Sequence, residues 1–325
     1  MPWKKFTFCF VMLYFTIQAP SPQAISNSGA LTIDPSPYSR VLALSDSHGM
    51  FSALEKLLRA AGLMDTRDHW TGANALLIVV GDSIDKGVQS IENLDLWMSL
   101  QKQAQASGGR VVHLLGNHEA EFLADPNNNK AVEFVAEIRS RGLAIKEFTD
   151  LNQPHGAFLT NMPLAARVGN WLFAHAGFYP KMTWSDFSSL AATRLSSGSY
   201  GDPMITGSDS ILEMKGWWKD SSLIRNEQTA LAQGELQGVV FGHQTAAFGM
   251  KGKVAGVVAT NGVRFIKIDS GMAPQPEGLG NPGELIEFDH PSELTQGMNS
   301  LNPAALHVNR IKADGKSSPL TFGQL

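Results

Sequence analysis

The stretch "ALLIVVGDSIDKG" (Ala75–Gly87) joins a continuous apolar run to a glycine-flanked segment that holds two carboxylates. The apolar run is short and ends in β-branched residues, which is typical of a strand buried on both faces. Asp82 and Asp85 follow at once, where such a strand would end. The stretch is therefore either a polar turn or the part of a sheet edge that carries a functional site.

The same order of apolar run, polar loop and helical pattern occurs on both sides of this stretch. "RVLALSD" (Arg40–Asp46) precedes a helical pattern over 51–63, and "RVVHLLGNHE" (Arg110–Glu119) precedes one that extends through "AVEFVAEIRSRG". A third helical pattern, around 91–105, follows the opening stretch. Strands that alternate with helices predict an α/β fold with buried parallel strands.

The second half of the chain predicts further strands and one insertion. Strand patterns occur over 170–177, 238–244, 253–260, 264–271 and 284–289, and we expect the last group to pair antiparallel. Residues 179–237 form an insertion with helical pieces, which we expect to cap the site. We assign 25–37 to a linker, 38–290 to the main domain, and 291–325 to a polar C-terminal extension, either a tail or an edge addition.

Residues 1–24 have the pattern of a secretory signal peptide. Lys4 and Lys5 precede an apolar segment of twelve residues, Phe6–Ile17, and small residues follow up to Ala24. A membrane anchor is the alternative, but a spanning helix needs about 20 apolar residues. We therefore expect export to the periplasm or the medium, with no stable membrane anchor.

The composition restricts the chemistry and the partners of the exported chain. The only cysteine, Cys9, lies in the signal segment, so a metal would be bound through oxygen and nitrogen. Loss of residues 1–24 removes two lysines and no acid, so the formal charge changes from −4 to −6. No basic run indicates nucleic acid as a partner, and the pattern predicts no oligomeric state.

Five predicted strand ends carry side chains that can bind metal, each beside a glycine. They are Asp46 and His48 in "SDSHG", Asp82 and Asp85 in "GDSIDKG", Asn117 and His118 in "GNHE", His175 in "HAG" and His243 in "GHQ". Taken singly, each is more often a turn or a core histidine. Their repeated place after apolar runs favours one shared site, because ligands of open α/β sheets bind at the carboxyl ends of the strands.

Such a cluster suits two divalent cations. It offers a carboxylate that can bridge them, neutral imidazoles, and open positions for water and an anionic oxygen. Manganese, iron and zinc all fit these ligands. The remaining histidines lack this context, and we interpret them as core or surface residues: His69, His113, His155, His290 and His307.

The joined motifs resemble the calcineurin-like metallophosphoesterases, and within them the phosphoprotein phosphatases. The family pattern is Asp-x-His-Gly, Gly-Asp-x-x-Asp-Arg-Gly, Gly-Asn-His-Glu and two separated histidines, which residues 40–272 follow. The closing "IDSGM" (Ile268–Met272) is similar to the Shewanella-like protein phosphatases. The resemblance implies a metallophosphoesterase-like α/β sandwich of two mixed β-sheets flanked by helices, with a helical cap insertion at 179–237.

The resemblance also implies roles for the matched residues. The metal ligands would be Asp46 and His48 for the first ion, Asp82 as the bridge, and Asn117, His175 and His243 for the second. Many metallophosphoesterases have a further histidine at the position of Thr245. The lack of this histidine agrees with the phosphoprotein phosphatase branch. The implied reaction is in-line attack of a metal-activated hydroxide on a phosphomonoester, with phosphorylated protein or a small phosphoester as substrate. His118 would protonate the leaving oxygen while Asp85 orients its ring.

Two lysines depart from the family pattern at phosphate-binding positions. Lys86 replaces the arginine of the second motif, and Lys219 in "GWWKD" (Gly216–Asp220) replaces one found in the Shewanella-like group; Arg225 could serve instead. Arginine binds phosphate through a rigid fork, whereas lysine offers one charge on a flexible stem. The phosphate contacts expected from the pattern are Lys86, Asn117 and Lys219.

Two alternatives to a phosphomonoesterase follow from the same residues. Dinucleoside tetraphosphatases and other nucleotide phosphoesterases share nearly the same ligands. A metal- and phosphate-binding protein with weak catalysis would explain the two lysines, but it would have no use for the pair Asp85 and His118.

Overall fold

The computed structural model describes residues 29–276, 278–296 and 306–325, so the signal segment expected at 1–24 lies outside the described residues. The helices are α1 (Phe51–Ala60), α2 (Ser90–Ala106), α3 (Asn117–Ala124), α4 (Val132–Ser140), α5 (Lys146–Thr149), α6 (Pro154–Thr160), α7 (Trp184–Ser196), α8 (Pro203–Thr206) and α9 (Ser221–Gln233), with the 3₁₀ turns η1 (Trp217–Lys219), η2 (Ala247–Gly249) and η3 (Pro291–Thr295). The strands are β1 (Ala30–Ile33), β2 (Val41–Leu44), β3 (Leu76–Val80), β4 (Arg110–Leu114), β5 (Ala165–Val168), β6 (Trp171–Ala174), β7 (Gly238–Phe241), β8 (Ala255–Val258), β9 (Arg264–Lys267), β10 (Glu284–Phe288), β11 (Val308–Lys312), β12 (Ser317–Pro319) and β13 (Phe322–Gln324).

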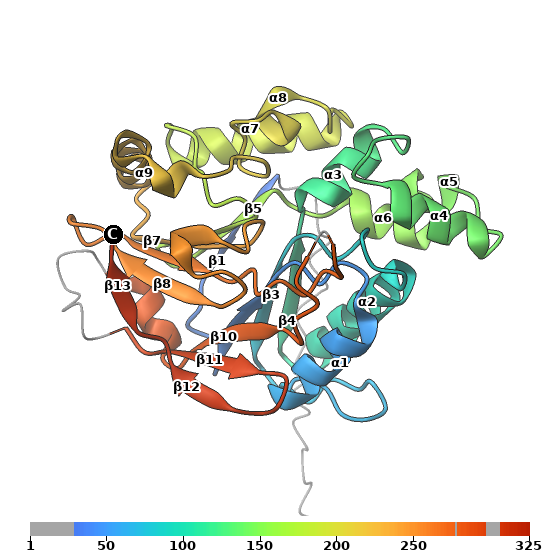
Figure 1. The fold of residues 1–325 in the computed structure, drawn as a ribbon, viewed down its shortest axis with the longest axis horizontal. Coiled ribbons are helices and arrows are strands. Elements are labelled where there is room, and N and C mark those ends of the chain that lie inside the picture. The colour runs from blue at the N-terminus through green and yellow to red at the C-terminus, as the bar shows by residue number, and fades with distance from the viewer. Residues whose placement is uncertain (1–28, 277, 297–305) are drawn as a thin grey trace, which may run out of the picture.

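Two mixed sheets pack face to face and carry helices on their outer faces (Figure 1). One sheet has the strand order β1-β5-β6-β7-β9-β8-β13, and the other has the order β12-β11-β10-β2-β3-β4. Helices α1 and α2 cover the six-stranded sheet, while α7 and α9 lie along the outer side of the seven-stranded sheet. This arrangement confirms the α/β sandwich that the sequence predicted.

The strand sequences explain why both faces of each sheet are covered. In β3, Leu76, Ile78 and Val80 point into the layer between the sheets, where they join residues of β6 and β7. Leu77 and Val79 point the other way, onto α1 and α2. All five positions of β3 are buried, which is the pattern of a strand packed on both faces.

The strand directions place the metal-competent side chains at one edge. Strands β2, β3 and β4 run parallel in one sheet, and β6, β7 and β9 run parallel in the other. Parallel strands end at the same edge of a sheet, so the loops that leave these strands lie together. The loops after β2, β3, β4, β6 and β7 carry the five predicted strand-end motifs.

Several elements differ from the sequence-based expectation. Ala30–Ile33, within the range assigned to a linker, forms β1 and pairs parallel with β5, because Ala30 and Ile33 supply buried apolar side chains. The helical stretch after "GNHE" is two helices, since the Asp125-Pro126 turn separates α3 from α4. β10 pairs with β2 in the other sheet, so only β8 and β9 of the last group are antiparallel neighbours.

The C-terminal residues are an addition to both sheets. β11 and β12 extend the six-stranded sheet beyond β10, and β13 pairs parallel with β8 in the seven-stranded sheet. Val308 and Ile311 are buried in the two apolar layers that this sheet separates. No helix among the described residues is long and apolar enough to cross a membrane.

Candidate metal centre

Buried polar side chains from five loops meet at the carboxyl edge of the two sheets. Around the Asp82 carboxylate, its Oδ2 atom lies 3.2 Å from His175 Nε2, 3.5 Å from His48 Nε2 and 4.0 Å from His118 Nε2. Two groups of potential ligands share this carboxylate. They are His48, Asp82 and His118, and Asp82, His175 and His243, each with ligand atoms within 4.8 Å of one another.

Three histidines are oriented through the nitrogen that faces away from this centre. His48 Nδ1 lies 3.1 Å from the Ile84 carbonyl, and His175 Nδ1 lies 2.8 Å from the Val80 carbonyl. His243 Nε2 lies 3.2 Å from the Glu213 carbonyl. A carbonyl only accepts, so each ring donates an N–H there and keeps its other nitrogen for a cation. This arrangement is usual for metal-binding histidines.

Asn117 and Asp46 complete the ring of oxygen ligands. Asn117 Oδ1 lies 3.0 Å from His175 Nε2, and its Nδ2 donates to Glu213 Oε1 at 3.1 Å. Glu213 accepts only, so this bond turns the amide oxygen toward the centre. The Asp46 carboxylate lies 3.7 Å from His48 Nε2 and accepts the backbone N–H of His243 at 3.0 and 3.2 Å.

The electrostatics of the centre favour a cation. Burial, followed by the neighbouring Asp269 carboxylate, raises the pKa of Asp46 well above its usual range. Burial would also raise the pKa of Asp82, but His175 and its fellow imidazoles hold that pKa well below its usual range. Burial would lower the pKa of His175, yet Asp82 raises it to about 10. The negative charge of these buried carboxylates must be compensated by protons or by cations. Together with imidazoles oriented by carbonyls, they fit divalent metal ions.

His118 and Asp85 form a pair beside the centre. His118 Nδ1 lies 3.0 Å from Asp85 Oδ2 and 2.9 Å from the Lys130 carbonyl, two groups that accept, so Nδ1 carries a proton. Burial would raise the pKa of Asp85, but the hydrogen bonds from His118 and from the Phe134 N–H lower it overall. The free nitrogen of His118, Nε2, faces Asp82 at a longer distance than the nitrogens of His48 and His175.

A cleft of about 530 Å³ lies over the centre. Its floor includes Asp46, His48, His243 and Asp269, and its walls carry three lysines: Lys86, Lys215 and Lys219. Trp218 also lines the cleft, with Lys219 Nζ 6.0 Å from its ring centroid. Because η1 and the residues before it belong to the 179–237 insertion, the insertion forms one wall of the cleft.

The loops that hold the centre have unusual backbone conformations. Six non-glycine residues there have φ between +42° and +66°: Asp46, His48, Asp82, Asp85, Lys86 and His243. Such conformations cost about 1–3 kcal/mol each and occur mainly at functional sites. Close approach adds a second constraint, because a Cβ on Gly242 would lie 2.2 Å from Asp46 Oδ2, and one on Gly116 would lie 2.1 Å from Asp82 Oδ1.

The Glu119 carboxylate fastens the β3 loop to the β4 loop. Oε2 accepts the N–H groups of Asp82 and Gly116, each at 2.9 Å. Oε1 accepts the N–H groups of Ser83 at 2.7 Å and Ile84 at 3.2 Å. One fully buried side chain thus sets the distance between the loop of Asp82 and the loop of Asn117 and His118.

The sequence model of the calcineurin-like phosphoesterases matches residues 39–247, which contain all of the ligands just described. The chain belongs to the calcineurin-like phosphoesterase family. It is thus a family hydrolase with metal-competent residues at its centre, and enzymes of this family use divalent metals. The match confirms the resemblance drawn from the motifs.

Relatives of this phosphoesterase include a protein phosphatase and a dinucleoside tetraphosphatase. It is 29% identical over 141 residues to Shewanella-like protein phosphatase 1 of Plasmodium berghei, covering 42% of this chain and 39% of that protein. It is 32% identical over 139 residues to the symmetrical bis(5'-nucleosyl)-tetraphosphatase of Mannheimia succiniciproducens, covering 42% and 44%. These matches span less than half the length of each relative.

A solved structure supports the fold. The cold-active protein-tyrosine phosphatase of a psychrophilic Shewanella species superposes with a TM-score of 0.67 at 19% identity, covering 90% of this chain and 82% of that one. At this identity the likeness concerns the arrangement of sheets and helices.

The structure brings the predicted site residues of the phosphoesterase together and adds others. Lys86 and Lys219 both line the cleft, whereas Arg225 is an exposed residue of α9 outside the described cleft lining. Lys215 and Asp269 also line the cleft, although no sequence motif indicated a role for them. Asp269 follows the apolar run of β9 as the other carboxylates follow theirs, so the strand-end rule could have found it.

Proposed function

We propose that the chain is an exported phosphatase that hydrolyses phosphomonoesters, including phosphorylated protein side chains, with two divalent metal ions. The observation that carries this proposal is the Asp82 carboxylate, which lies 3.5 Å from His48 Nε2 and 3.2 Å from His175 Nε2, below a cleft whose floor includes His48 and whose walls carry three lysines. One shared carboxylate is what two neighbouring ions require. Lysines above them match an anionic substrate.

The chain's own residues would hold the metals as the sequence motifs suggest. His48 Nε2 lies 3.7 Å from Asp46 and 3.5 Å from Asp82, and would join them at the first ion. His175 Nε2 lies 3.2 Å from Asp82 and 3.0 Å from Asn117 Oδ1, and with His243 would join them at the second. Oxygen and imidazole ligands suit manganese, iron or zinc. When bound, such ions supply Lewis acidity, which activates water and neutralises charge on phosphoryl oxygens.

The cleft lysines would bind and orient the phosphoryl group. Lys86 Nζ lies 3.0 Å from His48 Nε2, the nitrogen that also faces the metal centre. A cation bound there would take that lone pair and repel the ammonium, which leaves Lys86 free to contact a phosphate oxygen. Lys215 and Lys219 approach from the insertion and extend the positive wall.

His118 would deliver the proton that the leaving oxygen needs. Its Nδ1 proton is held by Asp85 and the Lys130 carbonyl, so the transferable proton would sit on Nε2, which faces the centre. A carboxylate partner stabilises the charged imidazole before transfer. A protein that only bound phosphate would gain nothing from this pair.

A substrate panel on the purified protein tests the function. The panel holds p-nitrophenyl phosphate, phosphotyrosine and phosphoserine peptides, and diadenosine tetraphosphate, with metal content measured in the same samples. We expect turnover of the monoesters and its loss in Asp82→Asn, but not in the exposed control Asp209→Asn. A metal-filled protein without monoesterase activity would refute the proposal.

The same panel separates the alternatives. Preferred turnover of diadenosine tetraphosphate would favour the nucleotide hydrolase that the tetraphosphatase relative suggests. A metal-filled protein that turns over slowly, and that Lys86→Arg accelerates sharply, would favour a binding protein with weak catalysis.

Export is proposed from the sequence of residues 1–24. Cell fractionation of the native host, with N-terminal sequencing of the recovered protein, tests it. We expect protein outside the cytoplasm that begins near residue 25; an uncleaved cytoplasmic protein would contradict the proposal.

A further inference from the structure

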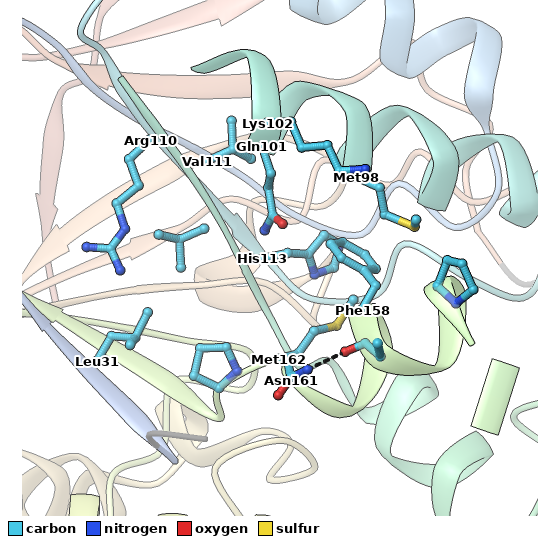
Figure 2. Close-up of a pocket in the computed structure, with 14 residues that line it drawn as sticks. Leu31, Met98, Gln101, Lys102, Arg110, Val111, His113, Phe158, Asn161 and Met162 are labelled. Atoms are coloured by element: carbon cyan, nitrogen blue, oxygen red, sulfur yellow. Dashed lines mark hydrogen bonds between the residues drawn. The ribbon is translucent and has the colours of Figure 1, made fainter. Parts of the chain in front are cut away.

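A second cavity, of about 330 Å³, lies between the edges of the two sheets. Figure 2 shows it between α2, the edge strand β4 and α6, with Leu31 of the other edge strand, β1, on its far side. Its lining shares no residue with the cleft over the metal centre. A ligand bound here would therefore not compete directly with a phosphoester for space.

The walls of this cavity are apolar, and its charges are positive. Leu31, Val111, Phe158 and Met162 supply apolar surface. Two side-chain amides are labelled in Figure 2, Gln101 and Asn161, and Asn161 already donates its Nδ2 to the Ala157 carbonyl at 2.7 Å.

Arg110 and Lys102 line this apolar surface, and neither has a counter-charge among the described residues. Within the described residues, no carboxylate lies within 4.0 Å of the Arg110 guanidinium or the Lys102 ammonium. Arg110 is half-buried at the start of β4, and Lys102 is an exposed residue of α2. A ligand with an apolar body and a single anionic head matches this lining, because its head would pair with the Arg110 guanidinium, which no carboxylate of the described residues neutralises.

The volume limits the size of the apolar body. An engineered cavity of about 150 Å³ holds one benzene molecule. A cavity about twice as large accepts an acyl chain of medium length, with its carboxylate at Arg110. A nucleotide or a phosphorylated peptide has too much polar surface for these walls.

One cavity residue connects to the loop of Asp82. The His113 ring packs edge-on against Phe158, with centroids 5.6 Å apart. His113 Nδ1 donates to the Leu114 carbonyl at 3.0 Å, so Nε2 accepts from the Ser83 hydroxyl at 2.7 Å. Burial lowers the pKa of His113 to about 3, which keeps the ring neutral and Nε2 able to accept. Ser83 directly follows Asp82, so a ligand against Phe158 and His113 touches the support of the metal loop.

We propose that this cavity binds a free monocarboxylate with a medium-length apolar chain, and that its occupancy is coupled to the metal centre through His113 and Ser83. Binding itself does not rest on the phosphatase proposal, since it requires no turnover. The coupling concerns the metal loop and is measured through affinities, so inactivity toward phosphoesters would leave it fully testable.

Titration calorimetry with decanoate tests the binding. We expect saturable binding of decanoate at one site, weaker binding of decanol, and a loss of about tenfold or more in affinity for Arg110→Gln, as expected for one charge-assisted hydrogen bond. The control Arg67→Gln, an exposed arginine outside the cavity, should bind like the unaltered protein. Absence of binding, or equal affinity for decanol, would overturn the proposal, as would binding only to anionic phospholipid vesicles.

Reciprocity tests the coupling. If decanoate alters the affinity for Mn²⁺ by some factor, Mn²⁺ must alter the affinity for decanoate by the same factor. The measured ratio is that of the Mn²⁺ affinities with and without decanoate. We expect it to differ from one by at least twofold in the unaltered protein and to be near one in His113→Phe, which keeps an aromatic ring but cannot accept from Ser83. A ratio of one in the unaltered protein would refute the coupling. A ratio unchanged in His113→Phe would refute the route.

Discussion

Replacing Glu119 by glutamine should loosen the two loops that hold the centre. The carboxylate accepts four backbone N–H groups, those of Asp82 and Gly116 on one oxygen and those of Ser83 and Ile84 on the other. An amide of the same shape has one oxygen and one NH₂ group. Whichever way it is turned, two N–H groups lose their acceptor and face a donor instead.

The cost of this change follows from the number of lost bonds. A hydrogen bond to a charged group contributes about 1.5–3 kcal/mol, so two of them amount to about 3–6 kcal/mol. Domains are commonly stable by only about 5–15 kcal/mol. Glu119→Gln should therefore lower the free energy of unfolding by a large fraction of its total, although it removes no atom from the packing.

Urea unfolding at pH 8 measures the effect, at a pH chosen because burial raises the pKa of Glu119. The control is Glu235→Gln, whose side chain is 83% exposed and pairs with Arg167 only at 3.8 Å, so it should change stability by less than about 0.5 kcal/mol. Elemental analysis should also show less bound metal in Glu119→Gln than in the control. A loss below about 1 kcal/mol, with the dependence on urea unchanged and metal retained, would refute the role given to Glu119.

Three further predictions concern the centre itself. Gly116→Ala should lower kcat/KM by about 10²-fold, because its Cβ would displace Asp82 by about 1 Å. The control Gly201→Ala, whose Cβ meets nothing closer than 3.8 Å, should keep the kcat/KM of the unaltered protein. Equal kcat/KM values for the two variants would contradict this. His118→Asn should cost about 10²-fold or more on phosphoserine peptides but much less on p-nitrophenyl phosphate, whose leaving group needs no proton; equal losses would exclude His118 as the acid. The pKa of His175, raised to about 10, means that a metal must displace its proton, so calorimetry should show Mn²⁺ affinity rising up to about tenfold per pH unit between pH 6 and 8; a flat profile would refute this.

The sequence was informative where residue order and backbone geometry coincide. An apolar run predicts a buried parallel strand, and the residue after it must lie at the sheet edge. Asp82 and His175 could therefore be placed together from the sequence alone. The same rule failed where the run is weak. β1 is four residues long with one exposed position, and its partner β5 lies far along the chain, so nothing local marks it as a strand.

Contacts that long side chains make between distant segments could also not be predicted from the sequence. Glu213 turns the amide of Asn117 from 96 positions away, and a lone glutamate in a helical insertion carries no local sign of that bond. The aromatic residues of the insertion show the same limit. Trp218 lines the cleft, whereas Trp217 and Phe187 are core residues. Neighbouring tryptophans differ in this way because a 3₁₀ turn points successive side chains in different directions.

The late position of β11–β13 has a consequence for how the protein is made. These strands complete pairings with β10 and β8, which are synthesised earlier. Until residues 306–325 have folded onto the sheets, β10 and β8 each present an unpaired edge, and such edges are sites of aggregation. Yield in recombinant expression should therefore depend on chaperones that protect these edges before the last strands pair, and an affinity tag fused after β13 should slow that pairing.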